Sequence, residues 1–270
     1  MSKVACALTI AGTDPSGGAG IQADLKTFQE LQTYGMSVLT SIVAQNTTGV
    51  QDIHHLPLNM IEQQLDSVLS DMPVHAFKTG MIANTDMMQV IARKVSDLDV
   101  PYIMDPVMVA TSGDALINKE ARSFLKKHLL PLTAVVTPNI PEAEFITGEK
   151  ITSTEDMKQA AEYIVKELGA GAALVKGGHI QGEAIDFLFD GKELHTFTVE
   201  RINTKNTHGT GCTYSAAITA YLSRGDTLIE AVRKSKEFVT AAIKHSLSLG
   251  SGSGPTKHWA IREEKGVKHV

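Results

Sequence analysis

Apolar segments of strand length alternate along the chain with segments in which apolar residues recur every three or four positions. The short apolar segments predict buried strands, and the three-to-four-residue repeat predicts amphipathic helices. In the segment 21–33, for example, Ile21, Leu25 and Phe28 share one helical face. The expected strands are Lys3–Ala11, Met36–Ala44, His75–Lys78, Tyr102–Met104, Ala134–Val136, Ala172–Lys176, Ala184–Phe189 and Leu194–Val199. The expected helices are Ile21–Thr33, Leu58–Ser70, Asp86–Val95, Lys119–His128, Glu155–Leu168, Gly211–Ser223 and Leu228–Ser246.

This alternation of strands and helices predicts an α/β protein with a mostly parallel sheet covered by helices on both faces. Asp190-Gly191 is a turn signal that joins the last two strands as a hairpin. No internal repeat or proline-rich linker divides the chain, so we expect one domain over residues 1–270, with Gly250–Gly254 as a loop or tail. In open α/β sheets, ligands bind at the carboxyl ends of the strands, which is where candidate motifs are sought.

Composition narrows the possible functions. The chain has 270 residues, of which 43% are hydrophobic and 5% aromatic, so alanine and branched aliphatic residues must fill its core. A net charge of −5 disfavours a nucleic acid or an anionic membrane as partner. Cys6 and Cys212 have unlike surroundings and suggest no disulfide framework, which favours a cytoplasmic location. No apolar run reaches transmembrane length, and the first residues lack the core of a signal peptide.

The strongest chemical signal is the segment Asn203–Thr213, NTKNTHGTGCT, which precedes an expected helix. Gly209 and Gly211, on either side of Thr210, let successive backbone N–H groups face one point, and the helix N-terminus adds partial positive charge there. Such a nest fits the oxygens of a transferring phosphoryl group. Cys212 falls in the first helical turn, where the N-terminus is expected to lower the pKa of its thiol, so a thiolate would accept a proton from an alcohol. The alternative is a glycine-rich helix entry with an inert cysteine.

A second glycine-rich turn, Gly17–Gly20, follows the first strand and opens a helix. It lacks the GxGxxG spacing of a dinucleotide site, so a tight turn is the simpler interpretation. Asp14 and Ser16 are candidates to cap the following helix. Asp24 lies just inside this helix, where it is either a ligand contact or a surface acid that complements the helix dipole.

Three further segments place polar residues after expected strands. Asp105, at the end of a strand, is well placed to approach Mg²⁺ directly or through water. Asn139 and Glu142 have the spacing of a capping box, and this structural role is compatible with a place in the phosphate region. Lys176-Gly177 begins the segment KGGH, whose lysine is a candidate contact for a nucleotide phosphate.

Other site classes find no support in the sequence. His54 and His55 are adjacent, a poor spacing for two metal ligands, and are expected in a surface or loop position. No cluster has zinc-site spacing, and Ser16 has no GxSxG motif around it. A Walker A motif is also lacking, so a kinase of this sequence is not a P-loop kinase.

Several segments together resemble one family along nearly the whole chain. They are Ala7–Asp24, Val43–Val50, Lys78–Met81, Asp105–Met108, Thr137–Glu142, Lys176–His179 and Asn203–Thr213. In this order they resemble the bacterial hydroxymethylpyrimidine/phosphomethylpyrimidine kinases of the ribokinase-like superfamily. The resemblance implies a three-layer α/β/α fold, the substrates ATP and 4-amino-5-hydroxymethyl-2-methylpyrimidine, the monophosphate as a second acceptor, a Mg²⁺ cofactor and a homodimer.

The same resemblance implies roles for individual residues. The expected pyrimidine contacts are Asp24, Gln45, Met81, Val43 and Val107. The expected metal and phosphate residues are Asp105, Glu142 and Asn139, and the expected nucleotide residues are Lys176 and Gly177. Gly209, Thr210 and Gly211 would form the anion hole, with Cys212 as the base.

Two alternatives stay open at this point. Many sugar kinases of the superfamily carry aspartate where this chain has Cys212, so the cysteine argues against a sugar kinase but not against a pyridoxal, pyridoxine or pyridoxamine kinase. Gln45 within AQNTTGV favours the pyrimidine. A non-catalytic protein that binds a nucleotide or vitamin precursor is the other alternative, and the intact segment around Cys212 argues against it.

Overall fold

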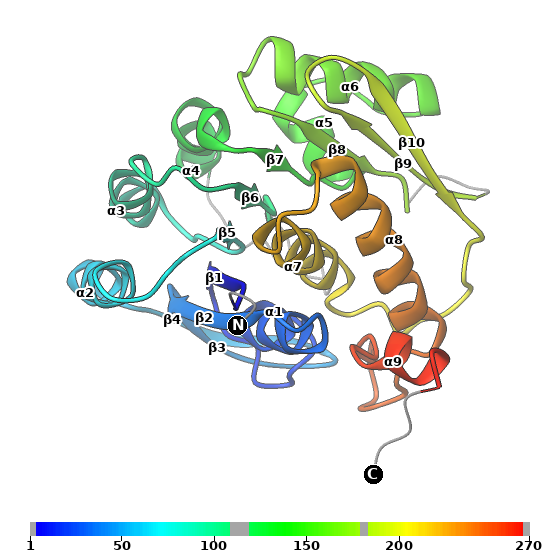
Figure 1. The fold of residues 1–270 in the computed structure, drawn as a ribbon, viewed down its shortest axis with the longest axis horizontal. Coiled ribbons are helices and arrows are strands. Elements are labelled where there is room, and N and C mark those ends of the chain that lie inside the picture. Colours follow the sequence, from blue (N-terminus) through cyan, green and yellow to red (C-terminus); the bar gives the residue numbers. More distant parts are fainter. Residues whose placement is uncertain (1–3, 109–118, 179–182, 267–270) are drawn as a thin grey trace.

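The computed structural model describes residues 4–108, 119–178 and 183–266 (Figure 1). Lys3, the first residue of the expected first strand, and His179 of the KGGH segment lie outside the described residues. Within these ranges, none of the helices combines the length and the apolar character needed to cross a membrane.

The centre of the molecule is an eight-stranded sheet. Its strands are β1 (Cys6–Ala11), β2 (Tyr34–Leu39), β5 (Ala76–Thr79), β6 (Tyr102–Met104), β7 (Val135–Val136), β8 (Ala173–Lys176), β9 (Ala184–Phe189) and β10 (Leu194–Val199), in the order β10-β9-β8-β7-β6-β5-β1-β2. From β8 to β2 along this order, each strand is parallel to its neighbours. Strand β9 pairs antiparallel with β8 and with β10, and the predicted Asp190-Gly191 turn joins β9 to β10. The expected mostly parallel sheet is therefore confirmed.

Helices cover both faces of this sheet (Figure 1). On one face lie α2 (Leu58–Leu69), α3 (Thr85–Val95), α4 (Lys119–Phe124), α5 (Ile140–Thr147) and α6 (Thr154–Lys166); on the other lie α1 (Gly20–Glu30), α7 (Thr210–Ser223) and α8 (Leu228–Lys244). Strand β1 is buried on both sides, which explains its mostly apolar sequence. Leu8 and Ile10 pack in the core on the side of α2 to α6, while Ala7 packs with Phe28 of α1 on the other side. The structure thus has the three expected layers.

The prediction of a single strand over Met36–Ala44 is wrong. The chain forms two strands instead, β2 and β3 (Ser41–Asn46), and β3 pairs with β4 (Gly49–His55) in a separate two-stranded antiparallel sheet. The break falls at the buried Thr40, whose hydroxyl donates to the Met81 carbonyl and whose amide donates to Ala11, so the chain turns away from β1 there. His54 and His55 are exposed as expected, but on strand β4 and not in a loop.

Smaller differences concern helix ends. The expected helix Lys119–His128 is α helical only to Phe124 and continues as a π-helical turn, η1 (Leu125–Leu129), and a 3-10 turn, η2 (Leu130–Leu132). A short helix, α9 (Ala260–Glu264), follows the loop that contains Gly250–Gly254. The proposed cap of α1 is also wrong as stated, because Ala19 occupies the N-cap position and Asp14 instead accepts the backbone N–H groups of Gly18 and Ala19.

Candidate active site

A cavity of about 550 Å³ lies at the carboxyl edge of the parallel strands, where ligand sites of open α/β sheets are expected. Its walls include nearly all the residues predicted as site residues: Asp24, Val43, Gln45, Met81, Asp105, Val107, Asn139, Glu142, Lys176, Gly209, Thr210, Gly211 and Cys212. Gly177 is the exception. Its N–H donates to Asp186 Oδ1 at 3.0 Å, and a Cβ at this position would collide with the Ile185 carbonyl, so the glycine serves the fold.

The N-terminus of α7 forms one wall of the cavity. Gly209 is the N-cap residue and has φ of +79°, a left-handed conformation that favours glycine. Among the described residues, no side chain caps this end of the helix. The Thr210 N–H donates to the Thr207 carbonyl at 3.2 Å, so the first-turn amides that are available to an anion in the cavity are those of Gly211 and Cys212. The nest expected from the sequence is therefore present in the geometry.

Cys212 lies in the first turn of α7, as predicted, but its thiol does not have the predicted acidity. Burial among packed protein atoms raises its pKa to about 12, an effect that the nearby Lys78 ammonium only partly offsets. The thiol is therefore protonated at neutral pH in the ligand-free protein, and the expected enlargement of the thiolate fraction is wrong for this state. Loss of hydration is the largest effect on this pKa, and it favours the neutral thiol.

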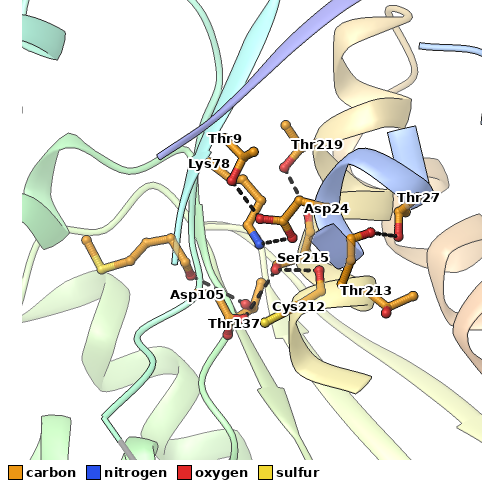
Figure 2. Close-up of polar contacts among 12 residues, drawn as sticks. Thr9, Asp24, Thr27, Lys78, Asp105, Thr137, Cys212, Thr213, Ser215 and Thr219 are labelled. Carbon is orange, nitrogen blue, oxygen red and sulfur yellow. Dashed lines mark hydrogen bonds and ion pairs between the residues drawn. The ribbon is translucent and has the colours of Figure 1, made fainter. Parts of the chain in front are cut away.

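Beneath the cavity, Lys78 of β5 and Asp24 of α1 form an ion pair (Figure 2). Lys78 Nζ lies 2.7 Å from Asp24 Oδ1, both side chains are fully buried, and the second carboxylate oxygen accepts the Thr9 hydroxyl at 2.6 Å. Burial by itself lowers the pKa of Lys78, but nearby acidic groups, Asp24 foremost, together more than compensate and raise it, so the ammonium is retained. Asp24 is thus a deeply buried acid and not a surface acid that complements a helix dipole.

A second ion pair joins β6 to β8 across the cavity. Lys176 Nζ lies 3.3 Å from Asp105 Oδ1. The Ser215 hydroxyl of α7 donates to the other carboxylate oxygen of Asp105 at 3.3 Å (Figure 2). Asp105 and Lys176 also surround Gly211, since a Cβ there would lie 3.5 Å from Lys176 Nζ and 3.6 Å from Asp105 Oδ2. Asp105 and Lys176 therefore both lie beside residues 209–212, here called the anion-binding turn.

Asn139 and Glu142 form the predicted capping box at the start of α5. The Asn139 side chain accepts the Glu142 N–H at 2.9 Å, and Glu142 Oε2 accepts the Asn139 N–H at 2.8 Å. Burial raises the pKa of Glu142 to about 7, with Lys176 opposing and Asp105 reinforcing this change. Both residues line the cavity, so the structural role and the place at the site coexist.

The mouth of the cavity is formed by two segments that sequence reasoning did not place there. The β3–β4 turn contributes residues 46–49, and the Gly250–Gly254 loop contributes Gly252 and Ser253. The two segments touch, because the Ser253 N–H donates to the Thr47 carbonyl at 3.1 Å and the Gly252 N–H to the Thr47 hydroxyl at 3.2 Å.

A second cavity, of about 670 Å³, adjoins the first. It lies between the β9–β10 side of the sheet and helix α8, with Val199, Tyr214 and Ile243 in its walls. The residues that line both cavities are Asn139, Glu142, Lys176, Thr207 and Thr210. Residues next to the anion-binding turn thus form the boundary between the two spaces.

Two residues of the cavity wall, Lys78 and His208, lie within motifs of the sequence but were not predicted as site residues. A lysine in the otherwise apolar strand Ala76–Thr79 is a usable signal, since a buried lysine needs a partner. For His208 the partner is Asp14, which lies far away in the sequence. Among the described residues, no group of three or more His, Cys, Asp or Glu side chains is arranged to hold a metal ion.

Comparison with known proteins agrees with this geometry. A family described as phosphomethylpyrimidine kinase matches residues 14–257. A hydroxymethylpyrimidine/phosphomethylpyrimidine kinase of Staphylococcus aureus (strain MSSA476) is 49% identical over 270 residues, 99% of this chain and 98% of that protein.

Solved structures give the same fold. A Bacillus subtilis pyridoxal kinase in complex with ADP is 41% identical, with a TM-score of 0.90 over 96% of this chain and 99% of that one. A phosphomethylpyrimidine kinase of Clostridium difficile 630 is 44% identical, with a TM-score of 0.80 over 90% and 100% of the two chains. The expected ribokinase-like fold is therefore confirmed.

Proposed function

The chain belongs to the phosphomethylpyrimidine kinase family, and we propose that it transfers the γ-phosphoryl group of ATP to 4-amino-5-hydroxymethyl-2-methylpyrimidine and then to the resulting monophosphate. The product is the diphosphate used in thiamine biosynthesis. One observation carries this proposal: a single cavity joins the expected pyrimidine contacts Asp24 and Gln45 to the uncapped start of α7 at Cys212.

The part of the cavity lined by the expected pyrimidine contacts, here called the acceptor half, suits a flat aminopyrimidine. Val43, Met81 and Val107 offer apolar surface to the ring. Gln45 has both a donor and an acceptor, which match the exocyclic amine and the ring nitrogens of the substrate. Asp24 lies deeper, and its carboxylate already accepts Lys78 and Thr9, so its contact with the ring is the more demanding of the two polar contacts.

The part of the cavity beside the start of α7, here called the phosphoryl half, stabilises the negative charge of the transferring group. Phosphoryl transfer passes through a loose transition state that depends on positioning and on charge stabilisation more than on a strong base. The amides of Gly209, Gly211 and Cys212 would hold the oxygens of the transferring group, and Lys176, whose Nζ lies beside Gly211, would contribute a positive charge. Cys212, beside this group, would accept the proton of the substrate hydroxyl. Because its thiol is protonated in the ligand-free protein, this role requires that bound substrates lower the pKa of Cys212.

Asp105 and Glu142 are the proposed residues for Mg²⁺. The donor set fits, because Mg²⁺ prefers oxygen ligands, keeps several waters and binds through one or two carboxylates together with substrate phosphates. Both carboxyl groups line the cavity beside Lys176. When bound, the ion supplies charge neutralisation at the nucleotide phosphates.

The second cavity is the proposed site for the base and ribose of ATP. It is large enough for a nucleoside and meets the first cavity at Lys176, Thr207 and Thr210. A nucleotide bound there would direct its phosphates across this boundary toward Gly209–Cys212.

A pyridoxal kinase is the second candidate. It is favoured by the likeness to the pyridoxal kinases of B. subtilis and S. aureus, which are 38–41% identical to this chain. Pyridoxal shares with the pyrimidine a hydroxymethyl group on a flat nitrogen heterocycle. The 49% identity to the S. aureus pyrimidine kinase favours the pyrimidine as the main substrate.

We also propose that residues 1–270 act as one kinase domain in a cytoplasmic homodimer. The dimer is supported by exposed apolar side chains on neighbouring elements at the β2 edge of the sheet, Tyr34, Ile42, Leu58 and Met60. The cytoplasmic location is supported by the cysteines, since Cys6 and Cys212 are not joined in a disulfide. Light scattering on the purified protein tests the dimer, and a monomer would contradict it.

An ATP-turnover assay with Mg²⁺ tests the proposed function. It compares hydroxymethylpyrimidine, its monophosphate and pyridoxal at equal concentrations. Turnover of both pyrimidines with weak turnover of pyridoxal supports the proposal. Preferred turnover of pyridoxal without reaction of the monophosphate would identify a pyridoxal kinase instead.

A further inference from the structure

The Asp14 carboxylate is a hub for hydrogen bonds in the loop between β1 and α1. Its Oδ1 accepts the Ser16 N–H at 2.9 Å and the Ser16 hydroxyl at 2.7 Å. Its Oδ2 accepts the N–H groups of Gly18 and Ala19, at 3.1 and 2.7 Å, and lies 2.7 Å from His208 Nε2. Burial alone would raise the pKa of Asp14, but the hydrogen bonds, that of His208 foremost, hold it well below its usual range. The group is therefore an ionised carboxylate that accepts these five hydrogen bonds and a further one from the Gln45 side chain.

His208 connects this loop to the anion-binding turn. The residue directly precedes Gly209, the N-cap of α7, and it lines the cavity. Its backbone is held as well, because its N–H donates to the Gly254 carbonyl and its carbonyl accepts the Thr256 N–H. A shift of His208 would therefore shift the start of α7.

The two segments are also in direct backbone contact. A Cβ at Gly209 would collide with the Gly18 carbonyl, and a Cβ at Gly18 would lie within 2.5 Å of the His208 ring. On the cavity side, Ala19 and Gly20 lie in the same wall as Gly209. The interaction of the Gln45 side chain with Asp14 brings a predicted pyrimidine contact into the same cluster.

We propose that Asp14 and His208 are positioning residues, whose buried hydrogen bond holds the loop 14–20 against residues 208–212 and so fixes the acceptor half of the cavity relative to its phosphoryl half. Asp14 does not line the cavity, so it acts through His208 and not on the substrate. In-line transfer depends on the distance between the substrate oxygen and the γ-phosphorus, and displacement of about 1 Å lowers turnover by on the order of 10²-fold. This inference rests on the proposed function.

The test uses three variants of the full chain. His208→Phe keeps a ring but loses the donor, His208→Gln keeps a donor, and Asp14→Asn removes the charge of the acceptor. His195→Phe is the matched control, because His195 Nε2 and Asp190 Oδ2 form a similar pair at 3.0 Å in the β9–β10 hairpin, away from the residues that line either cavity. The values of kcat and KM are measured with Mg·ATP and hydroxymethylpyrimidine, and circular dichroism gives the folded fraction at the assay temperature.

The wild-type result comes first, since no turnover of the pyrimidine there would contradict the proposed function itself. Given wild-type turnover, we expect kcat per folded molecule to fall at least about tenfold in His208→Phe and Asp14→Asn, and to recover to within about threefold in His208→Gln. The double variant that combines His208→Phe with Asp14→Asn is expected to be no slower than the slower of these two single variants, because the two residues act as a unit. Turnover of folded His208→Phe or Asp14→Asn within about twofold of His195→Phe, failure of glutamine to rescue, or multiplicative losses in the double variant would each overturn the positioning role. If His208→Phe does not fold, Asp14→Asn and His208→Gln decide the question by the same thresholds.

Discussion

Lys78 Nζ and Asp24 Oδ1 lie 2.7 Å apart with no solvent exposure of either side chain, directly below the cavity in which the phosphoryl group is expected to move. Such a pair is costly to bury and costly to break, because removal of one partner leaves the other charge without compensation. It therefore makes this wall of the site a rigid, polar surface, together with the buried side chains of Thr9, Asp105 and Ser215 around it.

Replacement of Lys78 tests this description. Lys78→Met leaves the Asp24 carboxylate buried and is expected to lower the free energy of unfolding by ~3–5 kcal/mol in urea denaturation. The control is Lys94→Met, which removes the partially exposed partner of Asp66 and Glu62 at the surface, with Nζ 2.6 Å from Asp66 Oδ1; there we expect no resolvable change. Equal effects of the two substitutions would show that burial of the Lys78 pair has no energetic consequence.

The anion-binding turn can be tested at two glycines with similar backbone conformations. Gly209 and Gly225 have φ of +79° and +89°, but a Cβ at Gly209 would collide with the Gly18 carbonyl, whereas none of the described atoms lies within 4 Å of a Cβ at Gly225. Gly225→Ala is expected to cost about 1–2 kcal/mol of stability and to leave kcat unchanged. Gly209→Ala is expected to lower kcat by at least about tenfold, because the turn must shift. Similar kcat values for the two variants would contradict a preformed turn.

Cys212→Ala tests the proposed base. We expect kcat to fall by roughly 10²–10⁴, the usual contribution of a positioned acid–base group. Cys6→Ala serves as the control, since Cys6 lies at the start of β1 and is not among the residues of either cavity wall. A kcat of Cys212→Ala within about threefold of wild type would exclude the base role and leave the amides of α7 as the main contribution.

Gln45→Ala tests the acceptor half. Loss of a hydrogen bond to the ring is expected to raise the KM for hydroxymethylpyrimidine about tenfold, equivalent to ~1.4 kcal/mol, with little change in the KM for ATP. Gln51→Ala on the neighbouring strand β4 is the control, because Gln51 is exposed and bonds only to the Gly49 carbonyl among the described contacts. An unchanged KM for the pyrimidine would remove Gln45 from the proposed contacts.

A pH dependence of stability is expected from His258, which is buried behind α7 with its Nε2 3.1 Å from Thr213 Oγ1. Burial, with a smaller effect of Lys26, lowers the pKa of His258 from 6.5 to about 4. Between these values the unfolded chain binds a proton that the folded protein does not. The stability contributed by neutral His258 is thus fully present above pH 6.5 and is lost as the pH falls toward 4, by up to ~1.4 kcal/mol per pH unit.

Urea unfolding of wild type and His258→Gln from about pH 7 to about pH 4 checks this expectation. The glutamine variant should lack the contribution of the histidine, so its stability should fall less steeply over this range. Parallel curves for the two proteins would show that His258 does not titrate differently on folding.

Local sequence patterns predicted the layers and most helices because amphipathic spacing and continuous apolar strands are local properties. They failed at Thr40, where a buried residue that bonds to Ala11 and Met81 ends one strand and starts another, and this depends on the positions of distant segments. The cavity walls were predicted through motif resemblance, residue by residue. The raised pKa of the Cys212 thiol was not predicted, because the direction of a pKa shift depends on how much packed protein surrounds the sulfur. The position of Cys212 in the first helical turn does not reveal this packing.

The contacts of the Gly250–Gly254 loop have a consequence for biosynthesis. Gly252 and Ser253 line the same cavity as Ala11 of β1, and the same loop holds His208 through Gly254. During translation, the strands and most helices precede this loop in the chain and can form before it has left the ribosome. The cavity wall cannot be completed until the Gly250–Gly254 loop has also emerged. A nascent chain that exposes the sheet but not this loop would therefore lack a finished site.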